Sequence, residues 1–449
     1  MNQAISLLAT VAHFVRARWR WRFLQGRRLR AFQERRARRI VEYSNRHSPF
    51  YHEHWAGHDR RRWRTLPTVD KRLMMANFDR FNTAGIWREE AMSVALQAEA
   101  SRDFSPTVRG YTVGLSSGTS GHRGIFVAGP WEQAAWAGSI LSRTIHDLRP
   151  RRLRVAFFLR SNSNLYEKVG GLLVQFRFFD LMMPLAEAVE KLNEFKPHIV
   201  VGPPSLLGFL AEARREGTLD IEPERLVSVA EVLEPQDATY IVDTFKAPVH
   251  QIYQCTEGLL AVSCREGSLH VQEDAVVLQL EPLGTSSGDT TAARVSPIVT
   301  DLWRTTQPII RYHLNDVLRM SGKRCACGSP FRVIEAIEGR SDDIVYFMQE
   351  DGTERPFFPD TIRRMVLLAG SDIEDYMAVQ SRTGQLCVYL SVPHGADFAA
   401  VSESVRKSVD ATISAYGCLP AEVSIENGLP TKAAGVKRRR VVRQAVEGT

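Results

Sequence analysis

The sequence predicts an α/β protein with a large, parallel-rich first domain and a smaller α+β domain after it. The first observation is that short apolar runs alternate with helical stretches between residues 150 and 260. Strands that alternate with helices are typical of a largely parallel sheet. The second observation is a change of pattern near residue 342, after which a hairpin, a helix and a further strand follow one another.

Composition narrows the class of protein. Of the 449 residues, 44% are hydrophobic and 24% are charged, which is ordinary for a globular protein and excludes a disordered or collagen-like chain. No apolar run reaches the ~18 residues that a membrane-spanning helix needs. Six cysteines in a chain of this length do not indicate a secreted disulfide framework, and the first residues lack the basic start of a secretory signal. We therefore expect a cytoplasmic protein with reduced cysteines.

Residues 1–47 are expected to form a basic helical arm that breaks at Gly26. The first 50 residues contain 12 Arg, no Lys and two Glu, a net charge of +10, whereas the other 399 residues carry −3. Apolar residues recur there at helical spacing, namely Leu8, Val11, Val15, Trp19 and Phe23. The favoured interpretation is a helix packed on its own domain with a solvated Arg face. The alternative is contact of residues 1–45 with an anionic membrane surface. The nearly neutral body argues against a nucleic-acid partner.

Residues 48–341 are expected to form the large domain. Four short apolar runs predict its central strands, and the stretches between them predict helices. The predicted strands are 155–159, 198–202, 226–230 and 249–253, and the predicted helices are 185–195, 205–215 and 235–245. Ligands of parallel sheets bind beyond the carboxyl ends of the strands, so the site is expected in the polar turns that follow these runs.

Residues 342–449 are expected to form the small α+β domain. The pattern predicts a hairpin over Met377–Leu390, a helix over Phe398–Ser414 and a strand over Ala421–Ile425. A basic tail, Lys437–Arg443, follows.

The segment Leu115–Gly124 alternates glycine with serine and threonine. The backbone N–H groups of such a loop hold phosphate oxygens, and its hydroxyls add further donors. It is not a Walker loop, because no Gly-Lys-Ser/Thr ends it. Taken alone, the segment is equally compatible with a flexible turn.

Two carboxylates follow apolar runs. Glu257 comes directly after a predicted strand, where a carboxylate close to a phosphate loop commonly binds Mg²⁺. Asp316 ends an apolar stretch, where its carboxylate is placed to accept hydrogen bonds from ribose hydroxyls. Two further motifs are Glu338–Asp343 at the predicted domain boundary and the cationic segment Leu429–Arg440. The alternative for Glu257 is an ordinary surface carboxylate, and the alternative for Leu429–Arg440 is a solvated basic tail.

In their order and spacing, these five motifs resemble those of the adenylate-forming superfamily of acyl-CoA synthetases, adenylation domains and luciferases. The chain looks most like the phenylacetate–CoA ligase branch, and within it like enzymes related to deazaflavin-coenzyme adenylyltransferases. The resemblance runs from about Ser48 to Arg440. It implies a large ATP-binding domain and a mobile C-terminal lid. It also implies activation of a carboxylic acid by ATP and Mg²⁺ as an acyl-adenylate, with transfer to CoA.

The resemblance assigns a role to each matching position. The phosphate loop matches Ser116, Ser117, Gly118, Thr119, Ser120 and Gly121, and the adenine site matches Ala230, Glu231, Val232 and the stacking ring of Tyr253. The remaining matches are Thr256 at the α-phosphate, Glu257 at Mg²⁺, Asp316 and Arg340 at the ribose, Arg355 at a phosphate, Asp342 as the hinge and Lys437 as the lid lysine. Lys437, Glu257 and Thr119 are expected to be catalytic.

The chain departs from the family pattern at the lid. The family usually has Gly directly before the lid lysine, whereas here Val436 separates Gly435 from Lys437, so Lys432 is a competing candidate. This departure leaves open an adenylate-forming enzyme with another acceptor: an amine, a carrier-protein thiol or a phenolic hydroxyl that is itself adenylylated. A third hypothesis, from a different class, is a catalytically silent protein that binds at a membrane surface.

Four residues offer a possible metal site. Cys264, His270, Cys325 and Cys327 supply three thiolates and one imidazole, a complete tetrahedral set for zinc. The spacing is not that of a standard zinc finger, and the alternative is buried cysteines with a surface histidine. Related proteins of the branch carry a similar arrangement, and this resemblance favours a structural Zn²⁺.

The partner that the resemblance implies is a small-molecule carboxylic acid, and the branch favours an aromatic one. Its pocket is expected between Phe157 and Gly171 and around Gly202–Ser205, where Phe158, Tyr166 and Pro204 are candidate walls. Ordinary core packing is the alternative for these side chains. The sequence identifies neither the acid nor the oligomeric state, and a dimer is compatible with it.

Overall fold

The computed structural model describes residues 3–116, 124–145, 152–159, 174–181, 183–283, 294–367, 369–370, 372–430 and 439–444. The chain divides into two compact units. Unit 1 comprises Met1–Leu280, Ile298–Leu314 and Ser321–Glu335, and unit 2 comprises Glu281–Pro297, Asn315–Met320 and Ala336–Thr449. Three strands cross the division: β10 (Val276–Pro282), β11 (Arg294–Asp301) and β14 (Val333–Arg340).

The sheet of unit 1 confirms the predicted parallel α/β pattern. Its strands are β3 (Leu153–Leu159), β4 (Val174–Asp180), β5 (Ile199–Gly202), β6 (Arg225–Val229), β7 (Val249–Cys255), β8 (Gly258–Ser263) and β9 (Leu269–Val271). They lie in the order β9-β8-β7-β6-β5-β3-β4. Strands β4 to β7 are parallel, and β7, β8 and β9 pair in antiparallel fashion.

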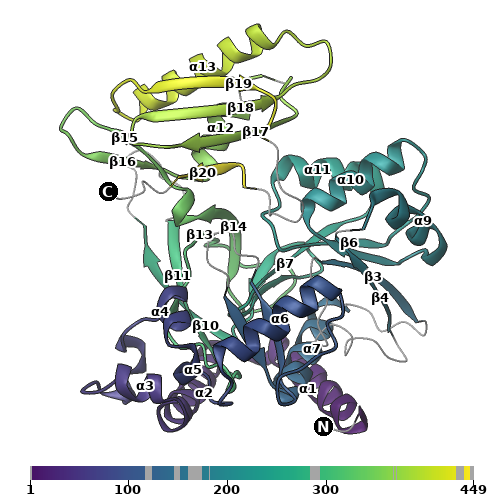
Figure 1. The fold of residues 1–449 in the computed structure, drawn as a ribbon, viewed down its shortest axis with the longest axis vertical. Coiled ribbons are helices and arrows are strands. Elements are labelled where there is room, and N and C mark those ends of the chain that lie inside the picture. The colour runs from purple at the N-terminus through teal and green to yellow at the C-terminus, as the bar shows by residue number, and fades with distance from the viewer. Residues whose placement is uncertain are drawn as a thin grey trace. The chain divides into compact units, whose positions relative to one another are not determined.

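Three helices cover this sheet at the predicted places: α9 (Leu185–Phe195), α10 (Pro204–Arg215) and α11 (Pro235–Phe245). Figure 1 shows them beside strands β3 to β7. Their apolar faces meet the strands in one buried core that includes Leu192, Leu207 and Ile241. Phe158 belongs to this core and stacks on Phe179 with ring centroids 4.6 Å apart, so the packing interpretation holds for Phe158.

The N-terminal arm packs on its own domain, as the favoured interpretation expects, but its outward face is not only arginine, because Leu8, Val11, Val15, Trp19 and Phe23 are 49–70% exposed. It consists of α1 (Gln3–Phe23) and α2 (Gly26–His47), and α1 lies along α7 (Pro130–Thr144) (Figure 1). The two helices approach closely at Gly138, where an added Cβ would lie 2.4 Å from the Thr10 carbonyl oxygen.

The remaining elements of unit 1 are α3 (Pro49–His54), η1 (Arg60–Thr65), α4 (Lys71–Ala76), α5 (Phe78–Phe81), α6 (Arg88–Ser101), β1 (Thr112–Leu115), β2 (Ile125–Ala128) and β12 (Tyr312–His313).

Unit 2 contains the predicted small α+β domain. A four-stranded sheet has the order β19-β18-β17-β20, and α12 and α13 pack on it around a single core. Its elements are β13 (Asp316–Met320), η2 (Ser341–Asp343), β15 (Val345–Met348), β16 (Glu354–Phe357), α12 (Pro359–Leu367), β17 (Asp375–Gln380), β18 (Gln385–Ser391), α13 (Phe398–Ala415), β19 (Glu422–Asn427) and β20 (Val441–Arg443).

The basic C-terminal segment is only partly a tail. Val441–Arg443 form β20, which pairs in parallel with β17. The Arg440 guanidinium donates to the Asp375 carboxylate at 2.8 Å, and Arg439 forms an ion pair with Asp343. Sequence reasoning missed this strand, because three residues are too short to show a period and their pairing partner lies about sixty residues earlier.

Candidate active site

The carboxyl ends of two parallel strands, β6 and β7, bring the predicted adenine residues together. The register of β6 on β7 pairs Val229 with Ile252, so the next residues, Ala230 and Tyr253, lie side by side at the same edge. Ala230 has a φ of +69°, and the Glu231 N–H donates to the Val229 carbonyl at 2.9 Å, which closes a γ-turn around Ala230. A left-handed conformation at a residue with a Cβ costs ~1–3 kcal/mol, and such strain tends to gather at ligand sites.

The carboxylate of Glu231 points back to the neighbouring strand–helix junction. It accepts a hydrogen bond of 3.4 Å from the Ser205 N–H in the first turn of α10. A carboxylate is stabilised there by the unpaired N–H groups and the dipole of the helix. The contact fixes the predicted adenine segment to α10.

The predicted Mg²⁺ carboxylate lies in the tight turn between β7 and β8. Glu257 is only 7% exposed, and its Oε2 accepts a 2.9 Å hydrogen bond from the Thr256 hydroxyl. Burial, and then the charge of Glu257, raise the pKa of the buried Tyr312 above its ordinary range. The structure therefore places Thr256 and Glu257 together at the expected strand end, with the Tyr312 ring close to the carboxylate.

Two charged residues that sequence reasoning missed support this turn. The Arg304 guanidinium donates to the Thr256 carbonyl, to the Val127 carbonyl at 3.2 Å and to the Gln307 side chain at 2.9 Å. The Glu132 carboxylate in α7 accepts from the N–H groups of residues 305 and 306 at 2.6 and 2.7 Å, which holds the Arg304 segment against α7. Neither residue stands in a recognisable motif, so only long-range contacts reveal them.

Asp301 is a buried carboxylate on the same segment. Its Oδ1 accepts from the backbone N–H groups of Trp303 and Arg304 at 2.7 and 2.9 Å. Burial raises the pKa of Asp301, against the opposing effect of the Arg304 charge and the two backbone hydrogen bonds. The carboxylate thus shapes the turn that places Arg304.

Only the two ends of the predicted phosphate loop are described. β1 and β2 form a hairpin in which Leu115 pairs with Ile125. The Ser116 N–H donates to the Gly124 carbonyl at 2.7 Å, and the Gly124 N–H donates to the Ser116 hydroxyl at 2.8 Å. The hairpin is therefore closed at its base. Ser117, Gly118, Thr119, Ser120 and Gly121 lie outside the described residues.

The predicted ribose pair is formed within unit 2. Asp316 begins β13 rather than ending an apolar stretch, and Arg340 ends β14. The Arg340 Nε lies 3.9 Å from the Asp316 Oδ1, and both side chains remain partly accessible. The Ser341 N–H donates to the Asn315 carbonyl at 2.6 Å, which ties the two strand ends together beside this pair.

The other predicted residues of the small domain are placed less fully. Arg355 is buried within unit 2, where it donates to the Tyr416 carbonyl and lies 5.1 Å from the centroid of the Tyr416 ring. Asp342 lies in η2, and its side chain is outside the described set. Lys432 and Lys437, like residues 160–171 of the predicted acid pocket, are also outside the described part of the chain.

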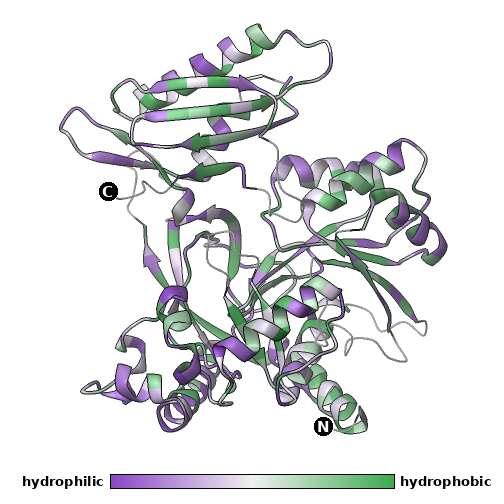
Figure 2. Ribbon diagram, in the orientation of Figure 1, coloured by the Kyte–Doolittle hydropathy of each residue, from purple (hydrophilic) through white to green (hydrophobic). Residues whose placement is uncertain are grey.

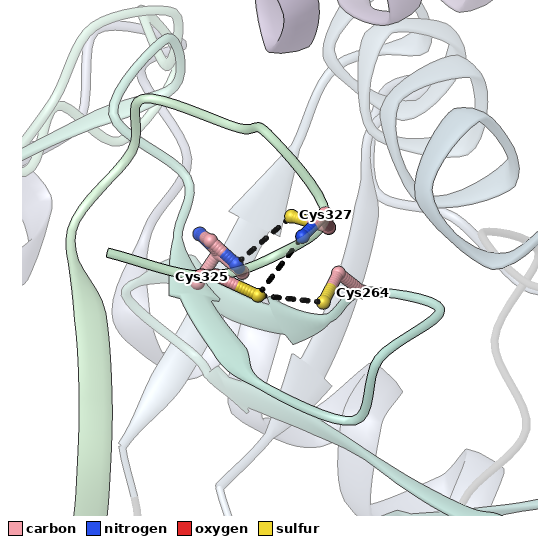
Figure 3. A group of neighbouring side chains, drawn as sticks. Cys264, Cys325 and Cys327 are labelled. Carbon is pink, nitrogen blue, oxygen red and sulfur yellow. Dashed lines mark hydrogen bonds between the residues drawn. The ribbon is translucent and has the colours of Figure 1, made fainter. Parts of the chain in front are cut away.

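The four metal-ligand candidates come together in unit 1. Single ligand atoms of Cys264, His270, Cys325 and Cys327 all lie within 4.8 Å of one another. The Cys264 and Cys325 sulfurs are 3.6 Å apart, and the Cys327 sulfur is 3.4 Å from His270 Nε2 (Figure 3). His270 is fully buried, so the alternative of a surface histidine is wrong.

The surroundings of this cluster prepare it to bind a cation. His270 Nδ1 lies 2.9 Å from the Phe331 carbonyl oxygen, so this nitrogen carries the proton and Nε2 faces the sulfurs as an acceptor. Burial raises the pKa of Cys264 to about 12. Burial opposes ionisation of Cys325 as well, but hydrogen bonds, first from Ser268 and the Cys327 N–H, lower its pKa to about 6.

The arm reaches this cluster directly. The Trp21 ring of α1 lies edge-on to the His270 ring at 5.0 Å and to the Phe331 ring at 5.4 Å. The buried Arg143 of α7 lies 4.7 Å from the Trp21 ring, donates to the Ala17 carbonyl and pairs with Asp274 at 2.9 Å. The arm is therefore part of the core of unit 1.

Comparison with solved structures identifies the architecture. The chain is similar to 2-hydroxyisobutyryl-CoA ligase in its postadenylation state in complex with R3-HIB-AMP, with a TM-score of 0.69, 18% identity, and 95% and 91% of the two chains covered. The chain has the fold of this CoA ligase. An open conformation of the same ligase, in complex with 2-HIB-AMP and CoA, matches at a TM-score of 0.59 and 20% identity, over 92% and 91% of the chains. No family model and no curated protein sequence matches the chain.

The fold expected from the motifs is thereby confirmed. The narrower resemblance to enzymes related to deazaflavin-coenzyme adenylyltransferases stays a prediction, as do the roles of the individual site residues.

Proposed function

We propose that the protein activates a carboxylic acid with ATP and Mg²⁺ as an acyl-adenylate, releases pyrophosphate, and transfers the acyl group to CoA. The observation that carries this proposal is the buried Glu257, which accepts a hydrogen bond from Thr256 in the turn that follows β7, the strand that also carries Tyr253. The fold supports it, because the ligase that this chain resembles was solved with an acyl-AMP and with CoA.

The surroundings of Glu257 fit a hard cation. Within the described ranges, no Lys or Arg forms an ion pair with this carboxylate, although it is 7% exposed. A buried carboxylate without a counter-charge is costly, and oxygen ligands of this kind suit Mg²⁺. When bound, Mg²⁺ supplies positive charge to the phosphate chain of the nucleotide.

The remaining residues have positioning roles in this proposal. Tyr253 offers a flat ring to the adenine, and the turn at Ala230 offers backbone groups along its edge. Asp316 accepts from the ribose hydroxyls, and Arg340 holds that carboxylate in place. Arg355 is assigned a phosphate contact and Asp342 the hinge by resemblance alone. Held in this way, the α-phosphorus is open to attack by the carboxylate oxygen of the substrate, with pyrophosphate as the leaving group.

Catalysis in this reaction is chiefly electrostatic. Negative charge accumulates around the α-phosphorus in the transition state, so donors and cations placed there lower the barrier. The chain offers the N–H groups and hydroxyls of residues 116–121 and the lysine of the lid, for which Lys437 is the first candidate. In the second step the CoA thiol attacks the acyl carbon, and AMP leaves.

A pyrophosphate-release assay with a panel of aromatic and aliphatic carboxylic acids, run with and without CoA, tests the proposal. We expect release with at least one aromatic acid and formation of its thioester when CoA is present. Release without a thioester would instead assign another acceptor: an amine, a carrier-protein thiol or a hydroxyl. No release with any acid, from a protein that binds ATP, would contradict the proposal.

We also propose that Cys264, His270, Cys325 and Cys327 hold one structural Zn²⁺. All four ligands come from the protein, the distances between them suit tetrahedral coordination, and the second nitrogen of His270 is oriented by a carbonyl. Thiolate ligands of this kind fit the reducing cytoplasm that the cysteine content predicts. Metal analysis of protein prepared without chelator should find about one zinc per chain, and finding none would remove this site.

A further inference from the structure

The inner face of α1 is buried against its own unit, whereas the opposite face is exposed in the described part of the chain. Leu8, Val11, Val15, Trp19 and Phe23 are 49–70% exposed, and we call these five residues the outer stripe. Their spacing of three or four residues places them on one side of the helix, away from the contact at Gly138. Figure 2 shows mostly hydrophobic colouring along α1. An exposed apolar row of this length marks an interaction surface.

The charged side chains of α1 and of the start of α2 are all of one sign. The sequence has no acidic residue before Glu34. Arg16 and Arg22 are exposed on α1, and Arg27 and Arg28 are exposed at the start of α2. The surface that this stripe presents is therefore apolar in the middle and cationic at its edges.

Other arginines of α1 already have structural roles. Arg18 donates to the Ile145 carbonyl at 3.0 Å, and Arg20 lies 4.8 Å from the centroid of the Trp303 ring. The outward Arg16 and Arg22 therefore add to the charge of the surface rather than to the core. Because the net charge of +10 is confined to the first 50 residues, two copies of this chain joined at their stripes would repel each other.

We propose that the outer stripe of α1 docks on an anionic lipid surface, with the helix lying flat in the headgroup region. The apolar side chains then enter the acyl boundary and the arginines contact lipid phosphates, as in interfacial amphipathic helices. Since α1 is already folded on α7, docking requires no ordering of the helix, which favours binding. No helix in the described part of the chain is long and apolar enough to span a membrane.

Flotation of the full-length chain with vesicles tests this directly. The probes are vesicles of phosphatidylcholine alone and of an equimolar mixture of phosphatidylcholine and phosphatidylglycerol. We expect binding to the anionic vesicles, weakening with added salt, and little binding to the neutral ones. Deletion of the arm is unsuitable, because it would uncover the α7 face at Gly138 and remove Trp21 from its contact with His270.

Point variants distinguish the contribution of the outer stripe to vesicle binding from that of other exposed apolar residues. Val15→Glu with Trp19→Glu should weaken anionic-vesicle binding about a hundredfold, roughly tenfold for each half-exposed side chain that no longer enters the lipid. Phe209→Glu on α10 is the matched control, because Phe209 is 53% exposed and Trp19 is 55% exposed. The control should bind like the unchanged protein. Circular dichroism and the unfolding temperature check that the variants are folded, and Trp19→Ala provides a milder variant if the double change unfolds the chain.

The charges are tested in the same way. Arg16→Glu with Arg22→Glu should lower binding about tenfold or more, whereas Arg88→Glu with Arg215→Glu, outside the arm, should not. Absence of binding by the unchanged protein, equal binding to neutral vesicles, or unchanged binding by the stripe variant would each overturn the proposal. So would a dimer that Val15→Glu dissociates, since that result would assign the stripe to a second copy.

Discussion

The close crossing of α1 and α7 makes a sharp prediction for Gly138→Ala. In a helix interior, alanine in place of glycine normally adds ~1 kcal/mol of stability. Here the new Cβ would lie 2.4 Å from the Thr10 carbonyl oxygen, 2.7 Å from the His13 Cβ and 2.8 Å from the Phe14 nitrogen. Two of these atoms belong to backbone, so α1 as a whole must move away. Overpacking of this kind costs ~1–3 kcal/mol, so we expect a net loss of up to about 2 kcal/mol.

Gly208→Ala in α10 is the control, because nothing lies within 4 Å of the Cβ that it adds. We expect this variant to be more stable than the original by ~0.5–1 kcal/mol. Comparing the two variants cancels the helix-propensity gain and leaves the steric cost of ~1–3 kcal/mol. Urea unfolding followed by tryptophan fluorescence is suitable, since all eight tryptophans lie in unit 1. If both substitutions stabilise the protein equally, α1 does not pack on α7 in this way.

Four further outcomes are expected. Glu257→Gln should lower the rate of pyrophosphate release by ~10²–10³ while leaving the fold intact, and an unchanged rate would exclude this carboxylate from the reaction. Lys437→Ala should abolish release and Lys432→Ala should not; the reverse result would move the lid lysine to the earlier position. Cys325→Ser should lower both the zinc content and the unfolding temperature of unit 1, and loss of neither would argue against a structural metal. Burial and neighbouring arginines lower the pKa of His13 below its ordinary 6.5, so the unfolded chain takes up a proton first as the pH falls. Stability should therefore decrease as the pH drops through 6.5, and His13→Asn should reduce that slope in urea titrations at several pH values.

The membrane proposal and the catalytic proposal can be tested independently of each other. The membrane proposal rests on the exposed side chains of α1, and the catalytic proposal rests on the buried groups around Glu257. A protein that binds anionic vesicles but releases no pyrophosphate would support the first and contradict the second.

Local pattern was sufficient for the regular elements of the fold. The helices at 185–195 and 235–245 were predicted at their observed bounds, because amphipathic periodicity and flanking strands are properties of neighbouring residues. A metal site at Cys264, His270, Cys325 and Cys327 could also be proposed from the sequence, since thiol and imidazole side chains are recognisable wherever they lie. Glu257 was predicted at a strand end for the same reason, because the apolar run that precedes it is local.

Tertiary structure decided everything that depends on residues far apart in the chain. The pairing of Asp316 with Arg340, the support of Thr256 by Arg304 and the packing of Trp21 on His270 are long-range contacts that no local period encodes. The arm shows the difference most clearly. Its sequence predicted a basic helix with one apolar row, Leu8 to Phe23, but only packing against Gly138 decided that this row is exposed and the opposite side buried, because burial is a property of the assembled core.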